Sequence, residues 1–289
     1  MAPVTRRGTQ PTDVLTFGFI VLFAAILLVH APEVAAWPWL LLADVLVVVL
    51  LALLRRLPAE GTFAELVGGG YPYILVTPFY WQLGVMQLDL GNIRDAVVQR
   101  WELGVFGAQV SVTWHQAMPS AALSFVLHLC YGAYYWMVAL VALWLWFSGK
   151  RDAFRRAAFI GGLAFYTSYL IFAVFPVAGP YYFFAPPASA FVDNWPARYV
   201  YFMLGNGSSM GTAFPSSHVV ASWCVVYAAW RDARTLALVL APIALGLAVG
   251  TVYGQFHYAV DALAGAVLSL LLMAAADPLR SRLRRLIPR

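Results

Sequence analysis

Residues 236–276 read LALVLAPIALGLAVGTVYGQFHYAVDALAGAVLSLLLMAAA, two long apolar runs joined by a short polar connection. The runs, Leu236–Gly254 and Tyr258–Ala276, are each close to the roughly 20 residues that a helix needs to cross about 30 Å of hydrocarbon. A segment inside lipid has to satisfy its own backbone hydrogen bonds, as a helix does. Each run is therefore predicted to be a membrane-spanning helix.

Six further apolar runs precede this stretch. They are Val14–Ala31, Val34–Leu54, Tyr71–Leu88, Ala121–Phe147, Ala157–Pro176 and Ala213–Trp230. The chain is 62% hydrophobic and 11% charged, whereas a soluble domain is roughly 45–50% apolar and about 25% charged. The sequence thus predicts an all-α integral membrane protein, a polytopic bundle of about eight transmembrane helices.

The basic residues are distributed unevenly along this bundle. Fifteen of the 18 lysines and arginines form five clusters, at residues 6–7, 55–56, 150–156, 231–234 and 280–289. With eight crossings all five clusters lie on one side, which the positive-inside rule assigns to the cytoplasm. This topology predicts cytoplasmic termini, with the protein in the inner membrane if the source is bacterial. It explains the net charge of +5 without nucleic-acid binding.

Two long connections are predicted on the opposite, extracytoplasmic side. Asp89–Ser120 is too polar to span the membrane and too apolar for a plain linker, so we expect an interfacial or re-entrant helix there. Val177–Thr212 is rich in proline, glycine and aromatic residues, which is typical of an ordered loop. The three remaining basic residues lie in these connections: Arg94, Arg100 and Arg198.

Two histidines that are candidates for catalysis fall on this same predicted face. His257 stands between the last two runs with Asp261 four residues later, and His218 begins another run. Residues four apart on a helix share a face, so the Asp261 carboxylate can orient one ring nitrogen of His257 and raise the basicity of the other. Three other histidines lack a partner at such spacing, which favours packing or interfacial roles: His30, His115 and His128.

The start of the run that carries His218 resembles an anion-binding helix terminus. Ser216 and Ser217 suit its first turn, where free N–H groups and the helix dipole favour a phosphate. A histidine with a carboxylate partner and a second histidine beside an anion fit phosphoryl transfer through a phosphohistidine. On spacing alone a simpler alternative stays open, in which His257 and Asp261 only bridge a helix end.

Four stretches of the sequence resemble the type-2 phosphatidic acid phosphatase superfamily, and most closely its inositol phosphorylceramide synthase-like branch. Ala213–His218 (AFPSSH) and Tyr253–Gly265 (YGQFHYAVDALAG) are similar to the second and third motifs of the superfamily. Phe175–Tyr182 (FPVAGPYY) resembles the F-P-x-x-G-P-R-Y segment of that branch, and Trp101–Gly107 (WELGVFG) resembles a stretch before its helical core. The resemblance extends from about Asp95 to Ala276.

The resemblance implies that His257 is the nucleophile that takes the phosphoryl group, that Asp261 orients it, and that His218 protonates the leaving group. It implies a core of six helices, so residues 1–56 would be an added N-terminal transmembrane hairpin and residues 57–289 the core. It implies no metal and no organic cofactor. The implied substrates are a phospholipid, a phosphosphingolipid or a polyprenyl phosphate, with water or an alcohol as acceptor.

The arginines that bind the phosphate in this superfamily are largely missing. The K-x-x-x-x-x-x-R-P run of its first motif has no counterpart, and Tyr181 stands where F-P-x-x-G-P-R-Y has its arginine. Thr251 takes the place of the arginine six residues before the histidine of the third motif. We expect Arg94, Arg100 or Arg198 to bind substrate instead, because all three are predicted on the same side as the histidines.

Four functions are weighed from the sequence. The first is a metal-independent lipid phosphotransferase or lipid phosphatase, and the second is a non-catalytic lipid-binding membrane protein that has lost its phosphate-binding arginines. A serine protease using Ser209 or Ser216 ranks lower because no G-x-S-G setting is present. A transporter also ranks lower, because the sequence lacks two similar halves. Asp44, in the second run, is interpreted as a hydrogen-bonded structural residue in preference to a proton relay.

Overall fold

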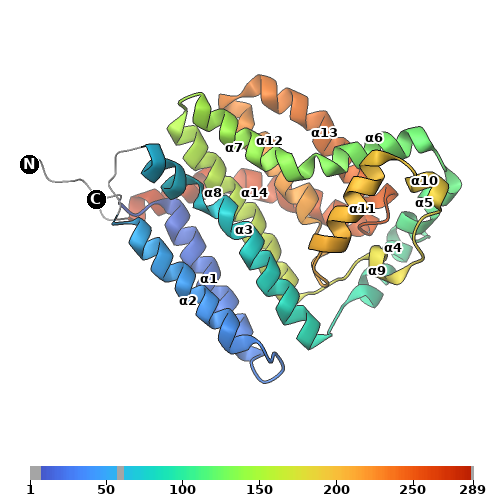
Figure 1. The fold of residues 1–289 in the computed structure, drawn as a ribbon, viewed down its shortest axis with the longest axis horizontal. Helices are drawn as coiled ribbons and strands as arrows, with labels where there is room; N and C mark the ends of the chain where they lie inside the picture. Colours follow the sequence, from blue (N-terminus) through green and yellow to red (C-terminus); the bar gives the residue numbers. More distant parts are fainter. Residues whose placement is uncertain (1–7, 57–61, 288–289) are drawn as a thin grey trace, which may run out of the picture.

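The structure, a computed structural model, describes residues 8–56 and 62–287, and every regular element in them is a helix. Six long helices form the body: α1 (Pro11–Val29), α2 (Trp37–Leu54), α3 (Thr62–Leu90), α8 (Arg151–Val174), α13 (Arg234–Tyr253) and α14 (Ala259–Leu286). Three of intermediate length complete it: α6 (Ala121–Gly132), α7 (Tyr134–Phe147) and α12 (Ser217–Asp232). The predicted all-α class is confirmed (Figure 1).

Helix α8 lies at the centre of the bundle. It packs against α1 and α3 on one side and against α7, α12 and α14 on the other. Small residues permit these close approaches. At Gly161, for example, an added Cβ would lie 3.0 Å from Cε1 of Tyr73. The buried apolar side chains form two large clusters that meet at α8, one around α12–α14 and one around α1–α3.

Helices α1 and α2 form a hairpin at the edge of the bundle, beside α3 and α8 (Figure 1). Phe19 of α1 stacks on Tyr166 of α8 with ring centroids 4.6 Å apart. Most of α2 is exposed, which suits a helix that faces lipid. Asp44 is a buried exception beside Gln82 of α3. The division of the chain after residue 56 stays a prediction.

Five of the described helices, α1, α2, α8, α13 and α14, are long and apolar enough to cross a membrane. Helices α6 and α7 pass the same test only together, as one span bent by 45°. The run Ala121–Phe147, expected as one helix, is thus broken near Ala133. These spans make the chain an integral membrane protein.

The remaining two predicted crossings would be α3 and α12. Helix α12 has 16 residues, fewer than the roughly 20 residues of a full span. Helix α3 has 29 residues but carries Pro72 and Pro78 in its interior. The number of eight crossings, and the sidedness that depends on it, stay predictions.

The two long connections fold together at one end of the molecule (Figure 1). Asp89–Ser120 contains α4 (Asp95–Phe106) and α5 (Val110–Ala117). Val177–Thr212 contains α9 (Pro180–Phe183), α10 (Ser189–Val192) and α11 (Trp195–Gly207). A parallel bridge between the first and last residues of this second connection closes it. Both connections therefore lie at the end of the bundle where α12 and α14 begin.

Candidate active site

His257 is held by a tight turn between α13 and α14. The N–H groups of Phe256 and His257 both donate to the carbonyl of Thr251, at 2.9 Å each. Gln255 has a φ of 59° in this turn, a left-handed conformation that costs a non-glycine residue roughly 1–2 kcal/mol. Its side-chain amide donates to the Ala185 carbonyl at 2.9 Å, which holds the turn in place. His257 is left only 4% exposed.

His218 lies in the first turn of α12, which packs closely on the first turn of α14. The N–H of Ser216 donates to the carbonyl of Asp261 at 3.0 Å. Gly265 permits this contact, because an added Cβ would lie 2.8 Å from the carbonyl oxygen of Ser216. The starts of the two helices, and the two histidines with them, are thereby held together.

The two histidines and the aspartate form a continuous line of contacts. Nε2 of His257 lies 3.3 Å from Nδ1 of His218, and Nδ1 of His257 lies 3.5 Å from Oδ2 of Asp261. The same Oδ2 accepts the N–H of Tyr258 at 2.9 Å, which fixes the carboxylate. On the far side, Nε2 of His218 lies 3.2 Å from the hydroxyl oxygen of Tyr131. The three residues singled out from the sequence are thus adjacent.

Burial keeps His257 neutral. Removal from water lowers the pKa of His257 from 6.5 to about 4, and a backbone hydrogen bond with Ala213 partly opposes this shift. The ring is therefore uncharged at neutral pH and keeps a lone pair on one nitrogen. A neutral imidazole oriented by a carboxylate has the properties of a nucleophile.

Glu102 of α4 binds the start of α14 beside His257. Its carboxylate accepts the N–H groups of Ala259 at 3.1 Å and of Val260 at 3.0 Å, and also the N–H of Val110 at 3.1 Å. Helix starts expose such N–H groups and favour a negative charge. Glu102 is fully buried, so it fixes the direction in which α14 leaves the site.

Asp95, also on α4, fixes the loop on the other side of the site. Its carboxylate accepts the N–H groups of Ala178 and Gly179, at 2.8 Å each, and the hydroxyl of Tyr258 at 3.1 Å. Gly179 has a φ of 97°, which glycine adopts without steric cost. Asp95 therefore ties the Phe175–Tyr182 segment to the helix starts.

Sequence reasoning missed these two carboxylates, because it expected an interfacial or re-entrant helix in the first connection and assigned substrate binding to its arginines. One signal was available. Asp95 and Glu102 are seven residues apart, a spacing that puts both on one face of a helix. Two carboxylates on one face of an otherwise apolar interfacial helix indicate that hydrogen-bond donors pack against that face, because a buried carboxylate needs such partners.

A small cavity of about 40 Å³ opens beside the two histidines. Much of its lining consists of neutral hydroxyl groups, from Tyr80, Tyr131, Tyr181, Tyr182, Ser208, Ser209 and Thr212. No arginine or lysine lines it among the described residues. It shares His218 with a cavity of about 290 Å³ among α3, α7 and α11. That cavity shares Tyr134 and Tyr135 with an apolar groove of about 510 Å³ between α3, α7 and α8.

The predicted substrate-binding residues lie in different places. Ser216 is fully buried, and Ser217 lines the cavity of about 290 Å³. Arg94 and Arg100 are exposed at α4, and Arg198 of α11 forms an exposed ion pair of 3.5 Å with an aspartate. In the part of the chain that the structure describes, none of these arginines lines the histidine cavity. Their role in binding stays a prediction.

The other buried histidines contact nearby backbone. Nδ1 of His115 lies 3.2 Å from the carbonyl of Ser111, and Nδ1 of His128 lies 2.7 Å from the carbonyl of Ser124. Over residues 8–56 and 62–287, no three or more His, Cys, Asp or Glu side chains are grouped so as to hold a metal ion.

Comparison with known proteins identifies the family. Comparisons with curated proteins and with solved structures give no match. A family model described as the PAP2 superfamily matches residues 97–275, nearly the whole stretch whose motifs resemble the type-2 phosphatidic acid phosphatases. The match includes His218, His257, Asp261 and Glu102. Because it spans more than half of the chain, the protein belongs to the PAP2 superfamily.

Proposed function

We propose that the protein is a lipid phosphotransferase or lipid phosphatase that works through a phosphohistidine on His257. The observation that carries this proposal is the 3.3 Å approach of Nε2 of His257 to Nδ1 of His218, with Asp261 behind His257. In-line phosphoryl transfer needs a nucleophile on one side of phosphorus and a proton donor on the other. PAP2 membership supports lipid phosphates as the general substrate class.

In the first step, Nε2 of His257 attacks phosphorus, the bond to the leaving oxygen breaks, and His218, protonated on both ring nitrogens beside the bound phosphate, gives that oxygen its Nδ1 proton and becomes neutral. Asp261, whose Oδ2 lies 3.5 Å from Nδ1 of His257, stabilises the positive charge that the ring acquires. In the second step, water or an alcohol attacks phosphorus, His218 takes its proton, and the bond to His257 breaks. Water gives hydrolysis and an alcohol gives transfer.

The chain of cavities supports a substrate with an apolar tail. The histidine cavity of about 40 Å³ has room for only a few waters, so a bound phosphate has to separate the two rings. From His218 the space widens toward the apolar groove, which is lined by side chains such as Ile74, Val138 and Leu143. A lipid tail in that groove would leave its phosphate at His218. Phospholipid, phosphosphingolipid and polyprenyl phosphate all have this form.

The charge around the site favours a phosphodiester donor. Asp95, Glu102 and Asp261 are buried near the histidines, and no basic side chain among the described residues lines the cavity. A phosphomonoester carries a charge of about −1.5 to −2 at pH 7, which neutral hydroxyl donors offset poorly. A phosphodiester carries a single charge. This preference agrees with the proposed inositol phosphorylceramide synthase-like branch.

The proposed topology has eight crossings, with α3 and α12 included. All five basic clusters then lie in the cytoplasm, and the histidines face the extracytoplasmic leaflet. The connections around the site, α4–α5 and α9–α11, expose large apolar side chains such as Trp101, Val105 and Phe202, which fits a surface at the membrane interface.

Turnover of a mixed phospholipid extract by the purified protein tests this function. We expect His257→Gln to lower turnover on the order of 10⁴-fold or more, as loss of a nucleophile does. His30→Gln, which removes a histidine far from the site, should retain it. Mass spectrometry of the products separates hydrolysis from transfer. Equal turnover by wild type and His257→Gln would reject the mechanism.

A second function is motivated by the missing arginines. If the folded wild-type protein binds phospholipid tightly but turns over none of the extract, non-catalytic lipid binding becomes the better proposal.

A further inference from the structure

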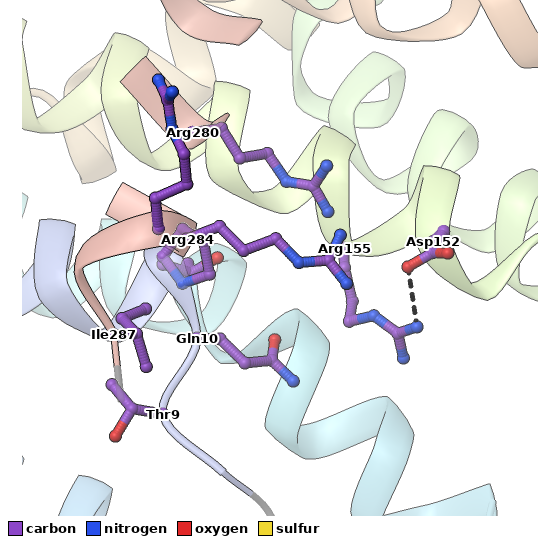
Figure 2. Close-up of a pocket in the computed structure, with 10 residues that line it drawn as sticks. Thr9, Gln10, Asp152, Arg155, Arg280, Arg284 and Ile287 are labelled. Carbon is purple, nitrogen blue, oxygen red and sulfur yellow. Dashed lines mark hydrogen bonds and ion pairs between the residues drawn. The ribbon is translucent and has the colours of Figure 1, made fainter. Parts of the chain in front are cut away.

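A cavity of about 810 Å³ lies at the opposite end of α14 from the histidines. The start of α1, the start of α8 and the end of α14 form its walls. Four arginines line it, Arg155, Arg280, Arg284 and Arg285, together with one carboxylate, Asp152. We call this cavity the arginine pocket (Figure 2).

Among the described residues, the arginine pocket holds more positive than negative charge, with four arginines and one carboxylate in its lining. Asp152 is hydrogen-bonded to Arg155 at 2.9 Å, the contact dashed in Figure 2. Arg280, Arg284 and Arg285 form no ion pair with any residue that the structure describes. Like charges in one pocket repel each other, and an anion between them removes that cost.

The neighbouring Arg156 shows the contrasting case. It is bound by Asp277 through two hydrogen bonds of 2.7 and 2.6 Å, and it is buried. The fold thus supplies a carboxylate to a guanidinium group that belongs to its core. In the arginine pocket, by contrast, no described carboxylate forms an ion pair with Arg280, Arg284 or Arg285.

The position of the pocket indicates which anion fills it. Helices α1, α8 and α14 are all candidate membrane spans, and guanidinium groups avoid the hydrocarbon. The ends of these spans therefore lie at the level of the lipid headgroups. Arg280 is half-buried and Arg284 is exposed, so the pocket opens to that surface. In Figure 2, Arg284 and Arg155 extend into one space from two different helices.

We propose that the arginine pocket binds the phosphate group of an anionic phospholipid, at a site separate from the histidines and independent of turnover there. Guanidinium forks match phosphate oxygens in charge and geometry. Gln10 and Thr9, in the chain segment before α1, add polar groups to the same wall. A phosphate bound there joins α1, α8 and α14 at their common end.

Native mass spectrometry of the detergent-purified full chain tests the site. Phosphatidylglycerol is titrated against zwitterionic phosphatidylcholine, and inorganic pyrophosphate serves as a soluble source of phosphate. We expect wild type to prefer phosphatidylglycerol and Arg280→Gln/Arg284→Gln to lose roughly twenty-five-fold in that preference, at about five-fold per arginine. Arg282→Gln is the matched control: it lies on the same helix end, is exposed, and does not line the pocket. Its preference should change by less than about two-fold, because salt screens the charge of an exposed side chain outside the pocket.

Three outcomes would overturn the proposal. The first is an unchanged preference in the double variant, and the second is an equal loss in Arg282→Gln. The third is arginine-dependent binding of pyrophosphate without any lipid preference, which would assign the pocket to phosphate in solution. If the double variant does not fold, Thr9→Glu replaces it. This change puts a competing carboxylate at the pocket wall, removes no arginine, and should weaken phosphatidylglycerol binding at least five-fold.

Discussion

The two ends of α14 deal with charge in opposite ways. At its start, Glu102 and Asp261 are buried carboxylates that accept backbone N–H groups. At its end, Arg280 and Arg284 stand in a pocket with one carboxylate between four guanidinium groups. Both arrangements suit the helix dipole, which favours anions at the start and cations at the end. They differ in completeness, because the protein itself supplies the three backbone N–H groups that bind Glu102, whereas the arginine pocket is proposed to take up an external anion.

This difference indicates separate purposes for the two ends. Carboxylates whose oxygens are bonded to the backbone hold a fixed geometry with or without substrate, as a nucleophile at a defined distance from its proton donor requires. Guanidinium groups on flexible side chains adapt to a ligand that is mobile in the membrane. Removing charge at the first end should therefore damage the fold, and removing charge at the second should change only binding.

The largest expected effect on stability is that of Glu102→Gln. The carboxylate of Glu102 accepts hydrogen bonds from three backbone N–H groups. In the glutamine side chain an NH₂ group replaces one carboxylate oxygen, so it faces some of these N–H groups and cannot accept from them. We expect a loss of about 4 kcal/mol in unfolding free energy. Thermal unfolding in detergent measures it, with exposed Arg100→Gln on the same helix as the control at about 0.5 kcal/mol or less. Equal melting temperatures for the two variants would contradict the comparison.

A smaller effect is expected from acid. His257 has a pKa of about 4 in the folded protein and about 6.5 when unfolded. The unfolded state thus binds the extra proton first as the pH falls. Stability is complete above about pH 6.5 and should decline by about 3 kcal/mol toward pH 4.

Melting temperatures of wild type and His257→Gln, recorded between pH 7 and pH 4.5, isolate this contribution, since every other titrating group is common to both. The decline should be smaller in the variant. Parallel curves would show that His257 is not a neutral buried base.

The smallest effect concerns the missing arginine of the F-P-x-x-G-P-R-Y segment. Tyr181 lines the histidine cavity, so Tyr181→Arg would add there a positive charge that none of the described lining residues now supplies. We expect kcat/KM for a lipid phosphomonoester to rise about ten-fold relative to a phosphodiester, or about 1.4 kcal/mol. Tyr181→Phe controls for loss of the hydroxyl. An unchanged ratio would argue against the proposed preference for phosphodiesters.

Local patterns predicted the parts of the site that depend on neighbouring residues. His257 and Asp261 are four residues apart, and the helix geometry that follows from this spacing brings them within 3.5 Å. The apolar runs likewise predicted the five long helices, and the bent pair α6–α7, that are long and apolar enough to span a membrane; the runs of α3 and α12 stay predictions. The catalytic roles of these residues stay proposals.

Contacts between distant residues were not predictable in this way. Glu102 meets Ala259 across 157 residues of sequence, and no local pattern encodes that distance. The break between α6 and α7 was also missed, because Ala121–Phe147 is apolar throughout. Beside the break, α6 packs closely on α11: an added Cβ at Gly132 would lie 3.2 Å from the ring of Tyr199.

Helix α14 has a further consequence through its length. Its 28 residues form a rod of about 42 Å at 1.5 Å per residue, close to the roughly 40–45 Å of a bilayer with its headgroups. One end carries the histidine site and the other the arginine pocket, so the two proposed phosphate sites lie about one membrane thickness apart. In a thinner membrane both ends cannot reach headgroup level unless the helix tilts. The tilt of α14 is therefore expected to follow the thickness of the membrane.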